Sequence, residues 1–354
     1  MTTRLNLGQM FMIGFDGMTV AAGHPVVEAI VREQAGGVIL FDRNVDGSGQ
    51  NIQSPGQLRE LTAALQGFAD IPLLIGVDQE GGRVCRLKEK DGFPATVAAK
   101  RLGSEPDVTA TRQQAELMAA TLAGHGINLN LAPVVDLDLN PDNPIISRYE
   151  RSFGAEPGLV ALHAAAFIAA HHARGVACCL KHFPGHGSSG GDSHLGFVDS
   201  SECWREIELE PYRRLFQDGF ADAVMTAHVV QRGLDPRGLP ATLSGPMVSG
   251  LLRGRLGFTG VIVSDDLQMR AITDKWSYEE AVQMAVLAGV DLLIVGNNLL
   301  RRENVVARGV RAIERLLDGN RIGEEALRAA GQRISLLKQK IAGEVPWKKN
   351  GPMT

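Results

Sequence analysis

The sequence predicts an α/β protein built as a single (β/α)8 TIM-type barrel. Short apolar runs, many of them β-branched, alternate with longer amphipathic stretches, and this alternation is typical of a parallel sheet covered by helices. Eight such runs occur, the number of strands in this barrel, and 354 residues suit its size. Because no Pro-rich linker or change of composition divides the chain, we expect one catalytic barrel over residues 1–343. A frayed tail, 344–354, follows.

The expected elements follow one another in chain order, and several predicted helices begin at Ser, Asp or Pro and end at Gly. The predicted strands are residues 11–15, 37–41, 73–78, 127–137, 177–183, 223–229, 261–267 and 292–296. The predicted helices are residues 25–35, 55–69, 107–126, 158–175, 208–220, 245–257, 277–289, 303–318 and 324–342. A doubly wound open sheet is the alternative fold. Its GxGxxG fingerprint is absent after the first strand, which continues as GFDGMT.

Composition and charge exclude several classes of protein. A net charge of -4 without a basic run argues against nucleic-acid binding, and 44% hydrophobic against 21% charged residues argues against disorder. There is no run of about 20 apolar residues to span a membrane, and the N-terminus lacks the pattern of a secretory signal. We therefore expect a cytoplasmic protein. Oligomeric state is left open, and a monomer is compatible with the sequence.

Four cysteines stand at Cys85, Cys178, Cys179 and Cys203. None has CxxC spacing, so a structural zinc site is not expected. Neighbouring Cys178 and Cys179 on one strand indicate buried core thiols, which suits a reducing compartment.

Chemistry in a parallel barrel is found where strands end and loops begin. Six of the eight predicted strands end in groups that can hydrogen-bond or titrate: Asp78, Asp136, Lys181, His182, His228, Asp265, Asp266 and Asn297. Charges beside an apolar core are costly unless they are paired, so these groups mark a candidate site.

The segment KHFPGHGSSGGDSHLG, residues 181–196, runs from a strand into a Gly/Ser-rich loop. Asp192 and His194 are two residues apart, so both side chains can point the same way on an extended loop. A carboxylate beside an imidazole favours the imidazolium, which makes a proton donor usable near neutral pH. A zinc site and a purely structural loop are the alternatives.

The segment VIVSDDLQM, residues 261–269, places two carboxylates at the end of a buried strand. Because side chains alternate along a strand, we expect Asp265 to face the barrel mouth and Asp266 to bind backbone donors or cap the next helix. The alternative is that both acids cap the helix.

Three further segments contain candidate site residues, each of which also has a purely structural interpretation. In GVDQEGGRVCR, Asp78 and Arg86 could hold sugar hydroxyls or pair with each other. In RYERSFG, Arg151 could bind a substrate oxygen or form a surface ion pair. In MTAHV, His228 is better explained as a structural group than as a catalyst.

Taken together and in this order, GVDQEGGRV, RSFG, KHFPGHG, DSH, MTAHV and SDDLQM resemble glycoside hydrolase family 3. The match is to its single-domain β-N-acetylglucosaminidases of the NagZ type and spans residues 7–296. The family fold is a (β/α)8 barrel, in agreement with the strand count.

The resemblance implies a role for each matching residue. Asp265 corresponds to the nucleophile, His194 to the general acid/base and Asp192 to its partner in a dyad. The residues that correspond to those gripping the sugar are Asp78, Arg86, Arg151, Lys181 and His182. It implies retaining hydrolysis of a terminal N-acetylglucosaminide without metal or cofactor, with a muropeptide as natural substrate in peptidoglycan recycling.

Two segments depart from the family pattern, and alternatives remain. GHGSSGGDSH stands where GHGDT is usual, and IISRYERSFG is longer than the usual version; both leave the natural substrate open. β-Glucosidase activity, phosphorolysis and attack by the substrate's own acetamido oxygen would use the same site. A non-catalytic sugar-binding barrel, a barrel isomerase and a metal-dependent hydrolase are rivals from other classes.

Overall fold

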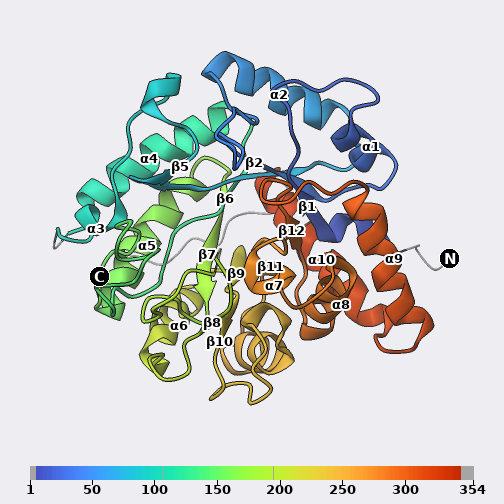
Figure 1. Cartoon of the computed structure of the whole chain (residues 1–354). Coiled ribbons are helices and arrows are strands. Elements are labelled where there is room, and N and C mark those ends of the chain that lie inside the picture. Colours follow the sequence, from blue (N-terminus) through green and yellow to red (C-terminus); the bar gives the residue numbers. More distant parts are fainter. Residues whose placement is uncertain (1–4, 106, 194, 344–354) are drawn as a thin grey trace.

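The computed structural model describes residues 5–105, 107–193 and 195–343, and it is a (β/α)8 barrel. In Figure 1 the strands lie at the centre and the helices surround them. The eight barrel strands are β1 (Phe11–Ile13), β2 (Gly37–Leu40), β3 (Leu74–Val77), β6 (Leu129–Asn130), β7 (Ala177–Phe183), β9 (Ala223–Thr226), β11 (Val261–Ser264) and β12 (Leu293–Val295). All eight coincide with predicted strands.

The sheet closes on itself. Its strands are parallel and lie in the order β11-β9-β7-β6-β3-β2-β1-β12. The two end strands meet at a parallel bridge between Val263 and Leu292, where the Ser264 amide donates to the Leu292 carbonyl at 2.9 Å. The predicted barrel is therefore confirmed, and the alternative of an open doubly wound sheet is wrong.

Both faces of the barrel strands are buried, as expected where side chains fill the inside and helices cover the outside. The longer helices are α1 (Pro25–Val31), α2 (Pro55–Gly67), α4 (Thr109–Gly124), α5 (Pro157–His172), α6 (Glu210–Gln217), α8 (Tyr278–Ala288), α9 (Val305–Asp318) and α10 (Glu324–Ile341). Cys178 and Cys179 are fully buried in β7, as the sequence predicted. Within the described part of the chain, no helix is long and apolar enough to cross a membrane.

Helix ends follow the capping chemistry of the sequence. Ser54 and Ser277 accept backbone hydrogen bonds at the start of α2 and α8, and Pro occupies the first position of α1, α2 and α5. Helix α8 ends at Gly289, whose φ of 106° is a conformation that glycine adopts without strain.

Two predicted elements differ in detail. The predicted strand 127–137 shortens to β6. Inter-strand hydrogen bonds continue at Leu131 and Ala132, Pro133 has no N–H to add another, and a bridge joins Val134 to Lys181. The predicted helix 245–257 is a π-helix, Pro246–Arg255. The predicted tail 344–354 lies outside the described residues.

Short elements that we did not predict surround the carboxyl ends of the barrel strands. An antiparallel pair, β4 (Gln79–Gly81) and β5 (Val84–Cys85), follows β3, and β8 (Val198–Asp199) pairs with β10 (Val229–Val230). Helices α3 (Ala99–Leu102) and α7 (Arg270–Thr273) and 3-10 helices Leu7–Met10, Glu89–Asp91, Glu206–Leu209 and Ala241–Leu243 complete the fold.

Candidate active site

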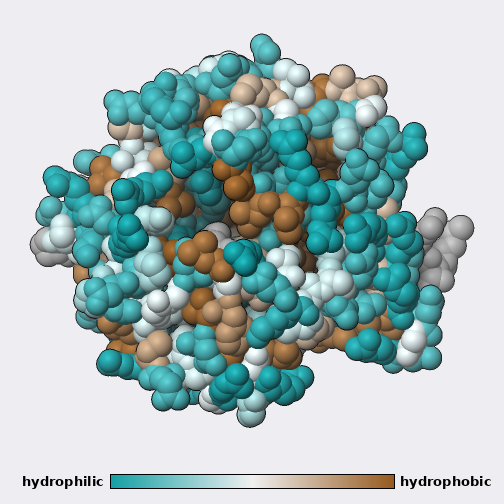
Figure 2. Space-filling model, in the orientation of Figure 1, coloured by the Kyte–Doolittle hydropathy of each residue, from teal (hydrophilic) through white to brown (hydrophobic). Residues whose placement is uncertain are grey.

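A cleft of about 850 Å³ opens at the carboxyl ends of the barrel strands. Figure 2 shows this face of the molecule, hollowed near the centre, where the barrel lies in Figure 1. Seven of the eight predicted site residues line the cleft: Asp78, Arg86, Arg151, Lys181, His182, Asp192 and Asp265. The eighth, His194, lies outside the described residues. Residues separated by up to 187 positions in the chain, from 78 to 265, therefore share one cleft.

Asp78 is held between two cations. Lys181 donates from Nζ to Asp78 Oδ1 at 2.7 Å, and Arg86 donates from Nη2 to Oδ2 at 3.1 Å. Burial by itself would raise the pKa of Asp78, but the charges of Lys181 and Arg86 outweigh it, so the pKa lies well below the usual carboxyl value. Asp78 is therefore a fixed anion that can accept hydrogen bonds from hydroxyl groups.

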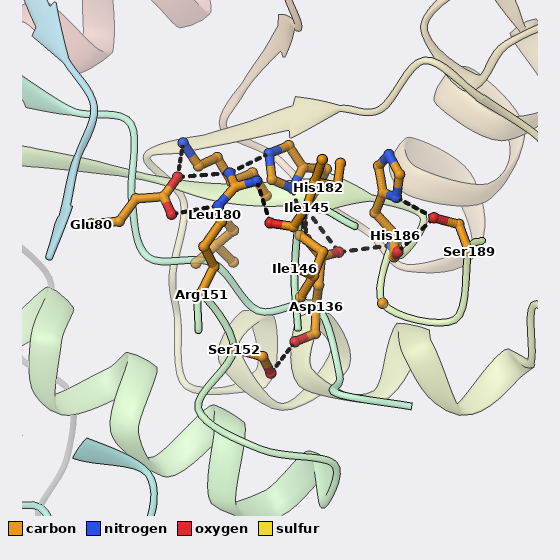
Figure 3. Close-up of polar contacts among 12 residues, drawn as sticks. Glu80, Asp136, Ile145, Ile146, Arg151, Ser152, Leu180, His182, His186 and Ser189 are labelled. Carbon is orange, nitrogen blue, oxygen red and sulfur yellow. Dashed lines mark hydrogen bonds and ion pairs between the residues drawn. The ribbon is translucent and has the colours of Figure 1, made fainter. Parts of the chain in front are cut away.

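Glu80 forms a second buried charge cluster beside the first. Arg151 grips its carboxylate with two hydrogen bonds of 2.8 Å, and Lys181 Nζ lies 2.6 Å from Glu80 Oε1. The fork of Arg151 and the two carboxylate oxygens are visible in Figure 3. Burial raises the pKa of Glu80, and Arg151 and Lys181 lower it by more, so the group is anionic. Lys181 thus bridges Asp78 and Glu80 with its own side chain almost fully buried.

His182 links this cluster to a third carboxylate, Asp136. Arg151 Nη2 lies 3.2 Å from His182 Nε2, and His182 Nδ1 lies 2.7 Å from Asp136 Oδ2 (Figure 3). Because a guanidinium can only donate, Nε2 is the accepting nitrogen and Nδ1 carries the proton toward Asp136. Asp136 also accepts from the backbone amides of His182 and His186. The ring of His182 is therefore fixed in orientation and tautomer.

Asp266 binds backbone donors, as the sequence predicted, and Asp265 lines the cleft. Asp266 Oδ1 accepts from the backbone amides of Gln268 at 2.9 Å and Gly296 at 3.1 Å. Asp265 follows β11, its amide donates to the Thr226 carbonyl, and its side chain lines the cleft. Asp265 Oδ1 accepts from the Asp266 amide at 2.8 Å. Asp266 thus stabilises the turn after β11, and both acids line the cleft.

The Gly/Ser-rich loop is firmly attached to the barrel. Asn143 Nδ2 donates to the His186 carbonyl at 2.8 Å, and His186 Nδ1 lies 2.6 Å from Ser189 Oγ. Burial lowers the pKa of His186 to about 4, so this imidazole is neutral at physiological pH. Asp192, near the end of the loop, lines the cleft.

His228 is a structural group, as expected. It is 1% exposed, its Nδ1 lies 2.8 Å from Thr242 Oγ1, and its Nε2 lies 2.9 Å from the Asp266 carbonyl. The surface ion pair expected as one alternative for Arg151 is wrong, because Arg151 pairs with Glu80 in the interior; Arg151 also lines the cleft. Among the residues that the structure describes, no group of three or more His, Cys, Asp or Glu side chains is arranged to hold a metal ion.

Sequence reasoning missed the central position of Glu80. The motif GVDQEGGRV contains Glu80, but only its Asp and Arg residues are selected as candidates from the sequence. The available signal was an acid within a motif rich in charges, two residues from Asp78. The hairpin β4–β5, which turns Glu80 toward Arg151, was not visible in the sequence pattern, so neither was the pairing.

The comparisons agree with the fold. Residues 2–337 match the family model described as the glycosyl hydrolase family 3 N terminal domain. A β-hexosaminidase of Tolumonas auensis is 39% identical over 77% of this chain and 78% of its own. The structure of a family 3 β-N-acetylglucosaminidase from Paenibacillus sp. str. FPU-7 superposes with a TM-score of 0.88 at 34% identity.

The Paenibacillus match covers 100% of this chain and 66% of that protein, so this chain spans about two thirds of its length. The β-N-acetylhexosaminidase of Beutenbergia cavernae is similar over 94% of this chain and 97% of its own, with a TM-score of 0.84 at 30% identity. The chain therefore belongs to glycosyl hydrolase family 3, and it is a glycoside hydrolase.

Proposed function

We propose that the protein is a retaining β-N-acetylglucosaminidase, which releases terminal N-acetylglucosamine from a β-glycoside. The observation that carries the proposal is the arrangement of Asp265 in one cleft with Asp78, Arg86, Lys181 and Arg151. The turn that carries Asp265 lines the cleft together with a fixed set of anions and cations able to bind hydroxyl groups. The names of the relatives support N-acetylglucosamine as the sugar.

In the proposed reaction Asp265 attacks the anomeric carbon and forms a covalent glycosyl-enzyme. The glycosidic bond breaks as the new bond forms, and the leaving oxygen takes a proton. Asp265 suits the role of nucleophile because it follows a barrel strand and its turn is stabilised separately by Asp266. Water then hydrolyses the ester and returns Asp265 as the carboxylate.

Sugar binding is assigned to the charge clusters at the base of the cleft. Asp78 and Arg86 can accept from and donate to neighbouring hydroxyl groups, and Lys181 and Arg151 are held in place by buried carboxylates. Because these groups already pair with each other, they need little reorganisation when the substrate binds. His182, fixed between Arg151 and Asp136, completes the set.

Proton transfer is assigned to a dyad of His194 and Asp192. The position of Asp192 at the cleft supports the assignment; the role of His194 rests on the sequence. In the first step the imidazolium would protonate the leaving oxygen, and in the second the neutral imidazole would deprotonate water.

A muropeptide fragment carrying N-acetylglucosamine, processed in the cytoplasm during peptidoglycan recycling, is the natural substrate in this proposal. It rests on the resemblance of the motifs to the NagZ type. The four cysteines, all unpaired, suit a reducing compartment.

The covalent step is tested with a slow fluorinated N-acetylglucosaminide, followed by mass analysis of the intact protein and of its peptides. We expect one sugar added, on the peptide that contains Asp265, and no addition to Asp265→Asn. Turnover of the slow substrate without an adduct would instead favour attack by the substrate's own acetamido oxygen and would overturn the covalent route.

A further inference from the structure

One buried acid beside the cleft has no part in the mechanism above. Glu208 lies on the 3-10 helix Glu206–Leu209, between β7 and α6, and it is 1% exposed. Among the described residues, no Lys or Arg charge is a main influence on its carboxylate. A buried acid without a counter-charge is costly, so its hydrogen bonds indicate what it does.

One of those hydrogen bonds, from the Arg205 amide to Oε1 at 3.5 Å, caps the helix of Glu208 itself, and the others go to the loop that carries Asp192. Glu208 Oε2 accepts from the Gly187 amide at 3.1 Å, and Oε1 accepts from Ser188 Oγ at 2.6 Å. The loop also passes very close to this side chain, since a Cβ added at Gly185, where φ is 123°, would lie 2.6 Å from the Cβ of Glu208. Glu208 therefore contacts the loop at Gly185, Gly187 and Ser188.

The contacts continue from these residues to the cleft. Ser189, next to Ser188, lies 2.6 Å from His186 Nδ1, and Ser193 Oγ lies 3.5 Å from the other ring nitrogen of His186. Asp192 precedes Ser193 and lines the cleft. A run of buried contacts thus leads from Glu208 to Ser193, the neighbour of Asp192.

We propose that Glu208 is a positioning residue for proton transfer, which holds loop 184–193 so that Asp192 faces the leaving group of the substrate. This inference rests on the proposed function, because it assumes that Asp192 belongs to the acid/base dyad. Glu208 itself does not line the cleft and does not contact substrate.

The electrostatics of Glu208 suit a hydrogen-bonding role. Burial raises the pKa of Glu208 to about 7, the hydrogen bond from Ser188 opposes this, and the nearby charge of Asp136 adds to it. Tyr212, on α6, is also buried close to the carboxyl group. Both protonation states can hold the loop, since a neutral carboxyl accepts from Gly187 with one oxygen and donates to Ser188 with the other.

Because a neutral group with one acceptor and one donor can hold the loop, two substitutions of Glu208 should differ in effect. Glu208→Gln keeps one acceptor for Gly187 and one donor for Ser188, so it should preserve the position of the loop. Glu208→Leu has a similar volume but leaves the amide and the hydroxyl without a partner. Glu206→Leu is the matched control, because Glu206 is two residues away on the same 3-10 helix but exposed, paired at the surface with Arg213 and Arg255. Ser188→Ala removes only one hydrogen bond, so it still tests the proposal if Glu208→Leu does not fold.

The first measurement is kcat/KM for two aryl β-N-acetylglucosaminides, one with an activated leaving group (2,4-dinitrophenyl) and one with a poor leaving group (4-methoxyphenyl). This parameter reports the step in which the glycosidic bond breaks. For Glu208→Leu we expect a loss of about 30-fold on the poor leaving group and less than about threefold on the activated one, since acid catalysis contributes on the order of 10²–10⁴ and only the poor leaving group needs it. Ser188→Ala should show a smaller loss with the same selectivity, and Glu208→Gln and Glu206→Leu should resemble the wild type.

The second measurement is hydrogen exchange of the peptide covering residues 184–193, which does not depend on activity. It should exchange faster in Glu208→Leu than in Glu208→Gln or Glu206→Leu. Equal losses on both substrates, or unchanged exchange in Glu208→Leu and Ser188→Ala, would overturn the positioning role. A wild-type protein that cleaves neither substrate would contradict the proposed function, and the exchange measurement would still decide whether Glu208 holds the loop.

Discussion

At the scale of single residues, the base of the cleft is a chain of alternating charges. Arg86, Asp78, Lys181, Glu80 and Arg151 are each paired with the next. Such an arrangement is costly to desolvate, and it stabilises the fold only while every member is present. The benefit for function is that the groups facing a sugar are fixed before it binds.

Removing one carboxylate from this chain should therefore destabilise the protein strongly. For Glu80→Gln we expect a loss of about 3 kcal/mol or more in the free energy of unfolding, because Arg151 and Lys181 would be left buried without full compensation. The measurement is urea unfolding followed by circular dichroism. Glu28→Gln is the control, since Glu28 pairs with Arg32 at the exposed surface, and its loss should stay within about 0.5 kcal/mol. Equal losses in the two variants would contradict the account of the cluster.

His194 is the residue whose role depends most on sequence reasoning. We expect His194→Ala to reduce kcat/KM on poor leaving groups by about 10²-fold or more and to have a much smaller effect on activated aryl glycosides. Steady-state kinetics on a series of aryl glycosides with graded leaving groups measures this. If the loss is the same across the series, His194 is not the acid.

The sequence predicted most of the residues that line the cleft, but of their ion pairs only the one between Asp78 and Arg86 was among its alternatives. Strand-end positions and motif order were enough to place Asp78, Lys181, Asp265 and Asp192 in one cleft, because parallel strands end at the same edge. Glu80 and Glu208 could not be identified in the same way. Their partners are 71 and 20 residues away, and only the folded loops bring them together.

At the scale of secondary-structure elements, apolar runs and capping residues predicted the strands and long helices well. The errors occurred where a local feature overrides the pattern. Pro133 interrupts the ladder of the predicted strand 127–137, and β4–β5 is too short to leave a periodic signal. The π-helix Pro246–Arg255 has the same apolar pattern as an α-helix over ten residues, so the sequence could not distinguish the two.

Helix α8 offers a test of capping at this scale. Ser277 Oγ accepts from the Glu280 amide at 3.3 Å, and the Ser277 amide donates to the Glu280 carboxylate at 2.9 Å, which is a complete capping box. We expect Ser277→Ala to lower the free energy of unfolding by about 1 kcal/mol and to leave kcat and KM unchanged. Urea unfolding and steady-state kinetics measure the two quantities. A stability within error of the wild type would show that the box contributes nothing.

At the scale of the whole molecule, buried carboxylates of two kinds set the dependence of stability on pH. Asp78, Glu80 and Asp136 have lowered pKa values, because nearby cations or histidine outweigh burial. Their stabilising contribution is present above the ordinary carboxyl pKa and is lost as the pH falls through their folded-state values. Acid unfolding is thus expected below about pH 4.

Glu208 changes the stability of the protein with pH in the opposite direction. Burial raises its pKa from 4.5 to about 7, so its contribution is fully present below pH 4.5 and is lost as the pH rises through 7. Between pH 4.5 and 7.5, the unfolding free energy of the wild type should therefore fall by roughly 3 kcal/mol relative to that of Glu208→Gln. Chemical unfolding of both proteins across this range measures the difference. A constant difference would mean that Glu208 keeps an ordinary pKa.

The closed barrel explains how residues from β3, β7 and β11 reach one cleft, and the account of function depends on what happens there. The most direct test is aryl-glycoside cleavage by the wild type and by Asp265→Ala, using 4-nitrophenyl β-N-acetylglucosaminide and 4-nitrophenyl β-glucoside in phosphate-free buffer and then with phosphate. We predict strong release from the N-acetylglucosaminide without phosphate, and none by Asp265→Ala. Release mainly from the glucoside, release only with phosphate, or full activity of Asp265→Ala would contradict the account.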